Sequence, residues 1–332
     1  MDFNSTMNEF YDDFGYDAEY MSVSLCFWLL VPFSMPSILC SLFLLIHLLG
    51  TRTLRQPINN HSIIVVLILG LIYVSINVSS TTTFYRLNCL VWPQSPTFCS
   101  IWLFVDYGVY NAITVLLAWA SFERHILVFH QQLVNTHLKK IIFHYIPLYF
   151  LLIYMSAFYI IVMFFYPCTN DWNYTSDVCG DYGCYHDNDF LSYWELYLHG
   201  TVPVILIAFF NITLLLRVIC HKRTVHQPIV WKKYRKMAIQ LLSISALYLL
   251  VNFPLFFLAM MHLLGLMLNE PASEILMYFT DHVIMFLPFV CLGCLPELWK
   301  KLKNIFYVKH WIMTRIGTTQ VTPLPIQPRN NF

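Results

Sequence analysis

Two aspartates inside apolar stretches are the residues of this sequence best placed to do chemistry. Asp106 is the single charged residue between Phe98 and Phe122, and Asp281 lies in the largely apolar segment 272–295. A carboxylate within a membrane helix costs ~2.5–3.5 kcal/mol to insert, so each acid is a candidate ligand-binding group. Two close carboxylates cannot both ionise cheaply, so one would hold a proton or a bound cation would satisfy both.

A purely structural role is the alternative for both acids. Each could hydrogen-bond to a neighbouring side chain, and the candidate partners are Tyr107, Tyr110, His199 and His282. Buried polar groups are nearly always hydrogen-bonded, so this need exists whether or not a ligand binds. The sequence leaves ligand binding and structural hydrogen bonding equally open.

An adjacent acid and base, Glu123 and Arg124, close the same apolar stretch, and His125 follows them. The acid can hold the arginine in one state and release it in another, which is the chemistry of a switch. An interfacial charge pair without a switching role is the alternative. Cys99 stands 25 positions before Arg124, and at ~1.5 Å per helical residue the two lie at opposite faces of a bilayer.

The composition indicates the elements that must position these residues. Hydrophobic residues make up 58% of the 332 and charged residues 11%, whereas soluble domains contain roughly 25% charged residues. The composition therefore predicts an integral membrane protein. The apolar runs are long enough for helices rather than barrel strands, so we expect an all-α fold. We expect seven transmembrane helices, at about 22–49, 60–84, 99–130, 141–166, 194–220, 232–264 and 272–295.

The expected organisation has four parts. They are an acidic extracellular tail (1–21), the transmembrane domain (22–296), an amphipathic eighth helix on the inner membrane face (297–309) and a disordered cytoplasmic tail (310–332). Lys and Arg fall almost wholly into alternate loops, which predicts an outer N-terminus and an inner C-terminus. Fourteen acids lie in the expected outer segments beside Arg86 alone, with Glu195 taken as the last acid of the second outer loop. This balance favours a cationic ligand, a basic peptide rather than a small amine.

The spacing of Cys99 and the Glu123-Arg124 pair resembles helix three of the rhodopsin-like G-protein-coupled receptors, although His125 replaces the family's tyrosine. The resemblance implies a seven-helix receptor in the plasma membrane that binds an extracellular ligand and activates a heterotrimeric G protein. Asp106 falls where the family's amine receptors bind the ligand ammonium.

The later helices match the family less closely. The stretch from Tyr248 to Pro254 resembles the family's helix-six switch, with Asn252 in place of the usual tryptophan, and Pro288 alone matches the helix-seven motif. On this resemblance we expect ligand contacts from Asp106, Asp281, Tyr107, Tyr110 and Asn252. We expect the coupling switch to use Glu123, Arg124, His125, Tyr248, Pro254 and Pro288.

The family also joins helix three to the second outer loop through a disulfide. We expect Cys99 to bond to Cys184 and Cys168 to bond to Cys179, with Cys179 as the alternative partner of Cys99, because connectivity cannot be deduced from spacing. Exposed sequons predict glycosylation at Asn4 and Asn173.

Other classes of function have weaker support. A transporter or channel could use Asp106 and Asp281 along a polar pathway, but internal repeats and paired broken helices are not visible. A receptor fold that has lost coupling, acting as a decoy, is a further alternative. We expect no enzymatic activity, cofactor, metal site or nucleic-acid partner, and we interpret His61 and His144 as solitary residues. Membrane lipid is an expected partner.

Overall fold

The computed structural model describes residues 22–129, 132, 135–180, 183–224, 228–263, 270–295, 298–299 and 301–302. The chain divides into two compact units, residues 1–294 and 295–332. The predicted acidic tail with Asn4 and the predicted tail 310–332 lie outside the described residues. In the predicted eighth helix, residues 298–299 and 301–302 are helical.

The described residues of the first unit form seven helical segments, in the order that the sequence predicts. Several of them contain short π-helical turns, labelled η, between α-helical parts. Segment one is α2 (Val23–Gly50), and segment two comprises α4 (Ile58–Tyr73), η1 (Val74–Val78) and α5 (Ser79–Arg86). Segment three comprises α6 (Pro96–Leu103), η2 (Phe104–Val109) and α7 (Tyr110–Phe129), and segment four comprises α8 (His137–Lys140), η4 (Ile141–Tyr145), α9 (Ile146–Ile160) and η5 (Ile161–Phe165). Segment five comprises α10 (Asp189–Trp194), η8 (Glu195–Thr201) and α11 (Val202–Thr224), segment six is α12 (Pro228–Leu263), and segment seven is α13 (Glu270–Gly293). A short α3 (Arg52–Arg55) joins the first two segments.

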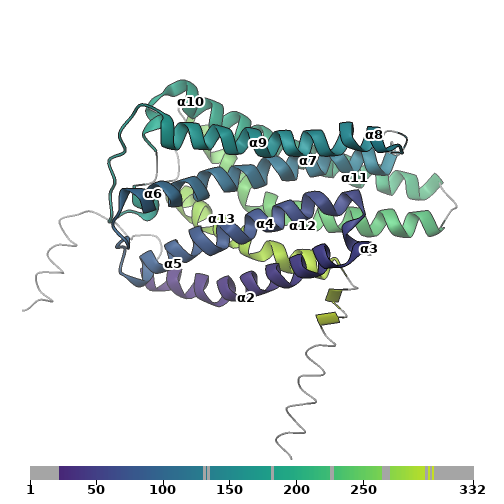
Figure 1. Cartoon of the computed structure of the whole chain (residues 1–332), viewed down its shortest axis with the longest axis horizontal. Helices are drawn as coiled ribbons and strands as arrows, with labels where there is room; N and C mark the ends of the chain where they lie inside the picture. The colour runs from purple at the N-terminus through teal and green to yellow at the C-terminus, as the bar shows by residue number, and fades with distance from the viewer. Residues whose placement is uncertain are drawn as a thin grey trace, which may run out of the picture. The chain divides into compact units, whose positions relative to one another are not determined.

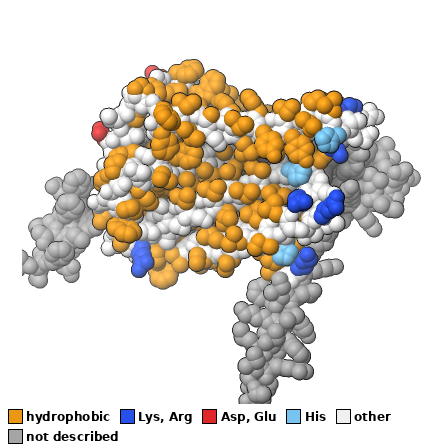
Figure 2. Space-filling model, in the orientation of Figure 1, with side chains coloured by type: hydrophobic (Ala, Val, Ile, Leu, Met, Phe, Trp, Pro, Cys, Tyr) orange, Lys and Arg blue, Asp and Glu red, His pale blue; other side chains and the backbone are white. Residues whose placement is uncertain are grey.

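The outer surface of these helices is apolar, as expected of a protein in a bilayer. Six of the described helices are long and apolar enough to span a membrane, and a shorter apolar stretch covers Leu242–Leu258. Large apolar side chains such as Trp28, Ile153 and Leu250 are more than half exposed. Figure 2 shows hydrophobic side chains spread over one face between two ends, with most of the visible Lys and Arg side chains near one end. Contiguous patches of this extent are rare on soluble monomers. The chain is a multi-pass membrane protein.

Segment three is the central helix of the bundle. Figure 1 shows α7 between α4 and α9, and α7 also contacts α11 and α12. It is the most enclosed of the six long apolar helices. Polar residues on this segment therefore face other helices rather than lipid, which explains how Asp106 and the Glu123-Arg124 pair are accommodated.

Several polar groups of the interior lie in π-helical turns, and four of them bear on the site. Asn77 is in η1, Asp106 in η2, His144 in η4 and Glu195 in η8. A π-helical turn interrupts the regular α-helical repeat and occurs frequently at functional sites. The π-helical turns therefore coincide with positions in the bundle where polar side chains, rather than apolar ones, pack between the helices.

Two disulfides tie the second loop, but not in the arrangement expected first. Cys99 bonds to Cys179 and Cys168 bonds to Cys184, with Cα–Cα distances of 5.8 and 6.0 Å. The predicted pairs Cys99–Cys184 and Cys168–Cys179 are wrong, and the alternative partner of Cys99 is the one found.

Local hydrogen bonds explain this connectivity. The amide of Val91 donates to the carbonyl of Tyr174 at 2.8 Å, which brings the 173–179 part of the loop against segments two and three. Cys179 is buried there beside Trp102. The amide of Cys184 donates to the side chain of Asn170 at 2.7 Å, which holds it near Cys168.

Candidate functional site

The two predicted aspartates lie together, joined by a tyrosine that the sequence did not single out. The hydroxyl of Tyr73 lies 2.8 Å from Oδ1 of Asp281 and 3.2 Å from Oδ1 of Asp106. Tyr73 and Asp281 are buried. The hydroxyl has one proton and can donate to one acid at a time. The acid that does not receive the Tyr73 hydrogen needs another partner. A proton on that acid, or a cation bound between the two acids, would supply it.

Segment two supplies the rest of the support for Asp281. The side-chain amide of Asn77 donates to Oδ1 of Asp281 at 3.1 Å, and its oxygen accepts from Nε1 of Trp102 at 2.6 Å. Asn77 and Trp102 are both buried. The amide therefore connects the seventh segment to the third through the second. Asn77 begins a glycosylation sequon, but its burial inside a helix leaves it a structural residue.

A second row of polar contacts links segments three and six. The hydroxyl of Tyr110 donates to Asn252, and the hydroxyls of Thr114 and Tyr248 share a hydrogen bond. The ring of Tyr110 lies 5.8 Å from that of Tyr73 and 6.2 Å from that of Tyr248. Asn252 and Tyr248 are fully buried. Hydrogen bonds, together with the ring contact between Tyr73 and Tyr110, thus form a path from the aspartates to segment six.

The other predicted residues lie around this path. Pro254 is inside α12, two residues beyond Asn252, and Pro288 is inside α13. Each proline removes a backbone donor, which permits a bend at that level of the helix. Tyr107 turns toward the second loop, where its ring contacts that of His186 at 5.8 Å.

A second buried acid, Glu195, was misplaced by the sequence interpretation. Glu195 is 5% exposed and lies inside segment five, because that helix begins at Asp189 rather than at 194. Its carboxylate accepts from the hydroxyls of Tyr159 and Tyr185 at 2.8 Å each, and from the Asn111 amide at 3.2 Å. It is therefore not a member of the acidic outer loop. The sequence feature that could have predicted its burial is an acid in a largely apolar run, eight positions before Pro203.

This acid holds the second loop against the bundle. Nε2 of His186 lies 3.4 Å from Oε2 of Glu195. Burial lowers the pKa of His186 to about 4, against the opposing charge of Asp187. Burial and the Glu195 carboxylate both raise the pKa of Tyr185. The neutral phenol of Tyr185 and the neutral imidazole of His186 thus both contact the carboxyl group of Glu195, and these contacts hold the second loop against the bundle.

At the opposite end of segment three, Glu123 is bonded to residues of segments two and four. Its Oε1 shares a hydrogen bond with Nδ1 of His144, and its Oε2 accepts from the Ser62 hydroxyl at 2.9 Å. Nε2 of His144 lies 3.1 Å from Nδ1 of His61. The interpretation of His61 and His144 as solitary residues is therefore wrong. Arg124 is 1% exposed at the same level.

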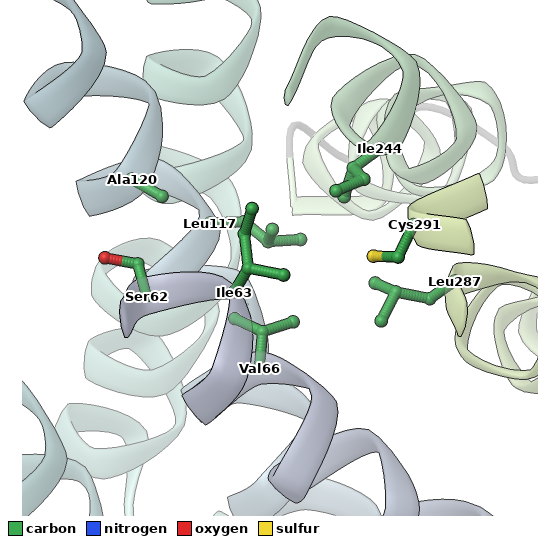
Figure 3. A pocket seen from close by; sticks show the side chains of 8 residues that line it. All are labelled: Ser62, Ile63, Val66, Leu117, Ala120, Ile244, Leu287 and Cys291. Atoms are coloured by element: carbon green, nitrogen blue, oxygen red, sulfur yellow. The ribbon is translucent and has the colours of Figure 1, made fainter. Parts of the chain in front are cut away.

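Two further features complete this end. Nε2 of His125 lies 2.7 Å from the carbonyl oxygen of Phe210 in segment five. Figure 3 shows a small cavity among segments two, three, six and seven. Its volume of about 10 Å³ is near that of one water and too small for an organic ligand. The lining residues are Ser62, Ile63, Val66, Leu117, Ala120, Ile244, Leu287 and Cys291.

Comparison with known proteins identifies the fold. No family model matches the sequence, and no curated protein matches it. The crystal structure of squid rhodopsin is similar, with a TM-score of 0.66 and 13% sequence identity over 92% of this chain and 93% of that one. This likeness establishes the seven-helix rhodopsin fold and confirms the predicted fold class.

Proposed function

We propose that this chain is a rhodopsin-like G-protein-coupled receptor that binds a cationic extracellular ligand and activates a heterotrimeric G protein. The observation that carries the proposal is the arrangement of segment three, which holds Asp106 near one end and Glu123-Arg124 near the other. Eighteen residues separate Asp106 from Arg124, which is about 27 Å of helix. One enclosed helix therefore connects the proposed ligand site to the proposed coupling site.

The ligand site is centred on Asp106 and Asp281. An ammonium or guanidinium group placed between these acids would offset one of their two negative charges and donate a hydrogen bond to each acid. The predicted outer segments are rich in acids, which favours a basic peptide over a small amine. Tyr107, Tyr110 and Asn252 are the further proposed ligand contacts, and the ring contact of Tyr110 with Tyr73 supports the inclusion of Tyr110.

Ligand binding would reach segment six through hydrogen bonds already in place. A ligand that moves Tyr110 changes its bond to Asn252, and the neighbouring Thr114–Tyr248 bond lies on the same two helices. Pro254 supplies the point at which α12 can bend. The ligand favours the bent state only by binding that state more tightly.

The orientation follows from the charges of the loops. We place the disulfide end outside the plasma membrane with the N-terminus, and the Arg124 end in the cytoplasm with the C-terminus. Disulfides persist in the oxidising exterior, which supports this placement. Asn173 is exposed in the second loop and would be accessible for glycosylation there.

Potency measurements on charge-removing variants test the ligand site. The chain would be challenged with a panel of basic peptides and amines, and Asp106→Asn and Asp281→Asn compared with the wild type. Loss of a charged hydrogen bond, about 1.5–3 kcal/mol, predicts a potency loss of roughly 10- to 150-fold.

The matched control is Asp189→Asn, because Asp189 is exposed at the same end of the bundle. Its potency should change far less than that of Asp106→Asn or Asp281→Asn, because water and salt screen an exposed charge. Equal potencies for all three variants would contradict the ligand site. An ion flux that requires Asp106, without any G-protein response, would favour a transporter or channel.

A further inference from the structure

Three cysteines lie together under the second loop, at the disulfide end of segments two and three. Cys99 and Cys179 are bonded to each other and buried, and Cys89 packs against the cluster that contains them. The thiol of Cys89 is free and the residue is partly exposed. The other free cysteines that the structure describes lie in α2 and in or directly after α13. A free thiol beside a disulfide has the components of thiol–disulfide exchange.

Backbone hydrogen bonds hold the stretch after segment two against the second loop. The amide of Val91, two residues after Cys89, donates to the carbonyl of Tyr174 at 2.8 Å. The amide of Asn173, next to Tyr174, donates to the carbonyl of Cys179 at 2.9 Å. The stretch that contains Cys89 is therefore joined to the stretch that contains Cys179 by main-chain contacts rather than by long side chains.

Cys89 and Cys179 share an uncommon backbone conformation. Among the described residues other than glycine, a positive φ occurs at Asn88, Cys89, Val178 and Cys179, with values of 54°, 62°, 48° and 62°. Residues with a side chain rarely adopt this conformation, and it is found preferentially at functional sites. At Cys89 the amide donates to the carbonyl of Phe84 at 3.0 Å, which fixes the turn. Strained backbone thus accompanies the free thiol and one sulfur of the adjacent disulfide.

We propose that Cys89 is a thiol–disulfide exchange site that moves the attachment of the second loop from segment three to the end of segment two. The thiolate of Cys89 attacks Sγ of Cys179. A bond between Cys89 and Cys179 forms, the bond between Cys99 and Cys179 breaks, and Cys99 leaves as a thiolate. Cys89 gives one proton to water and Cys99 takes one up, so the step consumes no oxidant or reductant. Cys179 is the sulfur attacked because the Val91–Tyr174 bond already holds its loop beside Cys89.

The protonation of Cys89 sets the rate of this exchange, because the thiolate is the attacking species. Burial, together with the nearby Asp177 carboxylate and Cys26 thiol, raises the pKa of Cys89 to about 11. The other titratable groups packed on the cluster are the hydroxyls of Tyr85 and Tyr174. The thiolate fraction is therefore small near neutral pH and rises about tenfold per pH unit below this pKa.

The exchange requires no G-protein coupling, so its test is independent of the proposed receptor function. The full chain in lipid nanodiscs is incubated at about pH 7 or about pH 9, quenched with acid, alkylated with N-ethylmaleimide and digested without reduction. Mass spectrometry then identifies the linked peptides. The proposal predicts a peptide in which Cys89 is joined to Cys179, together with newly alkylated Cys99. Its initial rate of formation should be about 100-fold higher at the higher pH.

Cys89→Ser and Cys26→Ser are the matched variants, because each removes one free thiol at the same end of the bundle. Cys26→Ser should still form the Cys89–Cys179 peptide, whereas Cys89→Ser should retain the bond between Cys99 and Cys179 at both pH values. Mixing unlabelled with ¹⁵N-labelled chains shows whether both linked peptides come from one chain, as the proposal requires. Absence of the Cys89–Cys179 peptide from the wild type at the higher pH, or its formation only between differently labelled chains, would overturn the proposal.

Discussion

Replacing Tyr185 with phenylalanine tests how strongly the second loop is fixed to the bundle. The Tyr185 hydroxyl donates to Oε2 of Glu195 at 2.8 Å, and both groups are buried. A buried acceptor that loses its donor costs about 1–3 kcal/mol, and phenylalanine leaves that carboxyl oxygen of Glu195 without this donor. At about 2–4 °C per kcal/mol, the expected fall in Tm is roughly 2–12 °C.

The assay is thermal unfolding of the purified chain in detergent, followed by far-UV circular dichroism with the disulfides intact. Tyr193→Phe is the matched control, because Tyr193 is 49% exposed on neighbouring α10. Its Tm should remain that of the wild type. Glu195→Gln added to Tyr185→Phe should cost less than the sum of the two single changes, since they share one interaction. Equal Tm values for Tyr185→Phe and Tyr193→Phe would refute the role of Glu195 as the anchor of the loop.

Two further outcomes are expected. Proteolysis without reduction should release a peptide containing Cys99 joined to Cys179, and a Cys99–Cys184 peptide would contradict the fold of the loop. His186 has a pKa of about 4 when folded and an ordinary value of about 6.5 when unfolded, so the unfolded chain binds more protons between these values. The free energy of unfolding should therefore be retained above about pH 6.5 and fall as the pH approaches 4. In His186→Gln the fall in Tm over this pH range should be smaller than in the wild type. An equal fall in Tm in the two proteins would contradict the role of His186.

The fold could be predicted because a bilayer imposes a local requirement on each segment. Every spanning helix needs about 20 apolar residues, so composition alone locates it. The sequence predicts the first and last residue of each helix less accurately, because polar residues are tolerated in the terminal turns. Placing the start of segment five at Trp194 rather than Asp189 left Glu195 at a loop boundary, and the buried acid was missed for that reason.

The candidate site could be predicted only in part. Asp106 and Asp281 stand out because a charge in an apolar run is costly. Tyr73 gave no such signal, since tyrosine is common in this chain, with 21 copies. His61 and His144 are 83 residues apart, and their contact depends on how segments two and four pack. Disulfide connectivity likewise depended on backbone hydrogen bonds that spacing does not reveal.

Agonist-free coupling tests the proposed receptor function most directly. Cells would express the wild type, Arg124→Ala and Arg217→Ala at matched surface levels with a panel of G-protein dissociation sensors. Arg217 is an exposed arginine on α11 that lies over the Phe129 ring and serves as the control. The account predicts basal dissociation of at least one G protein in the wild type and Arg217→Ala, and its loss in Arg124→Ala. Equal signals from all three chains across the panel would contradict it.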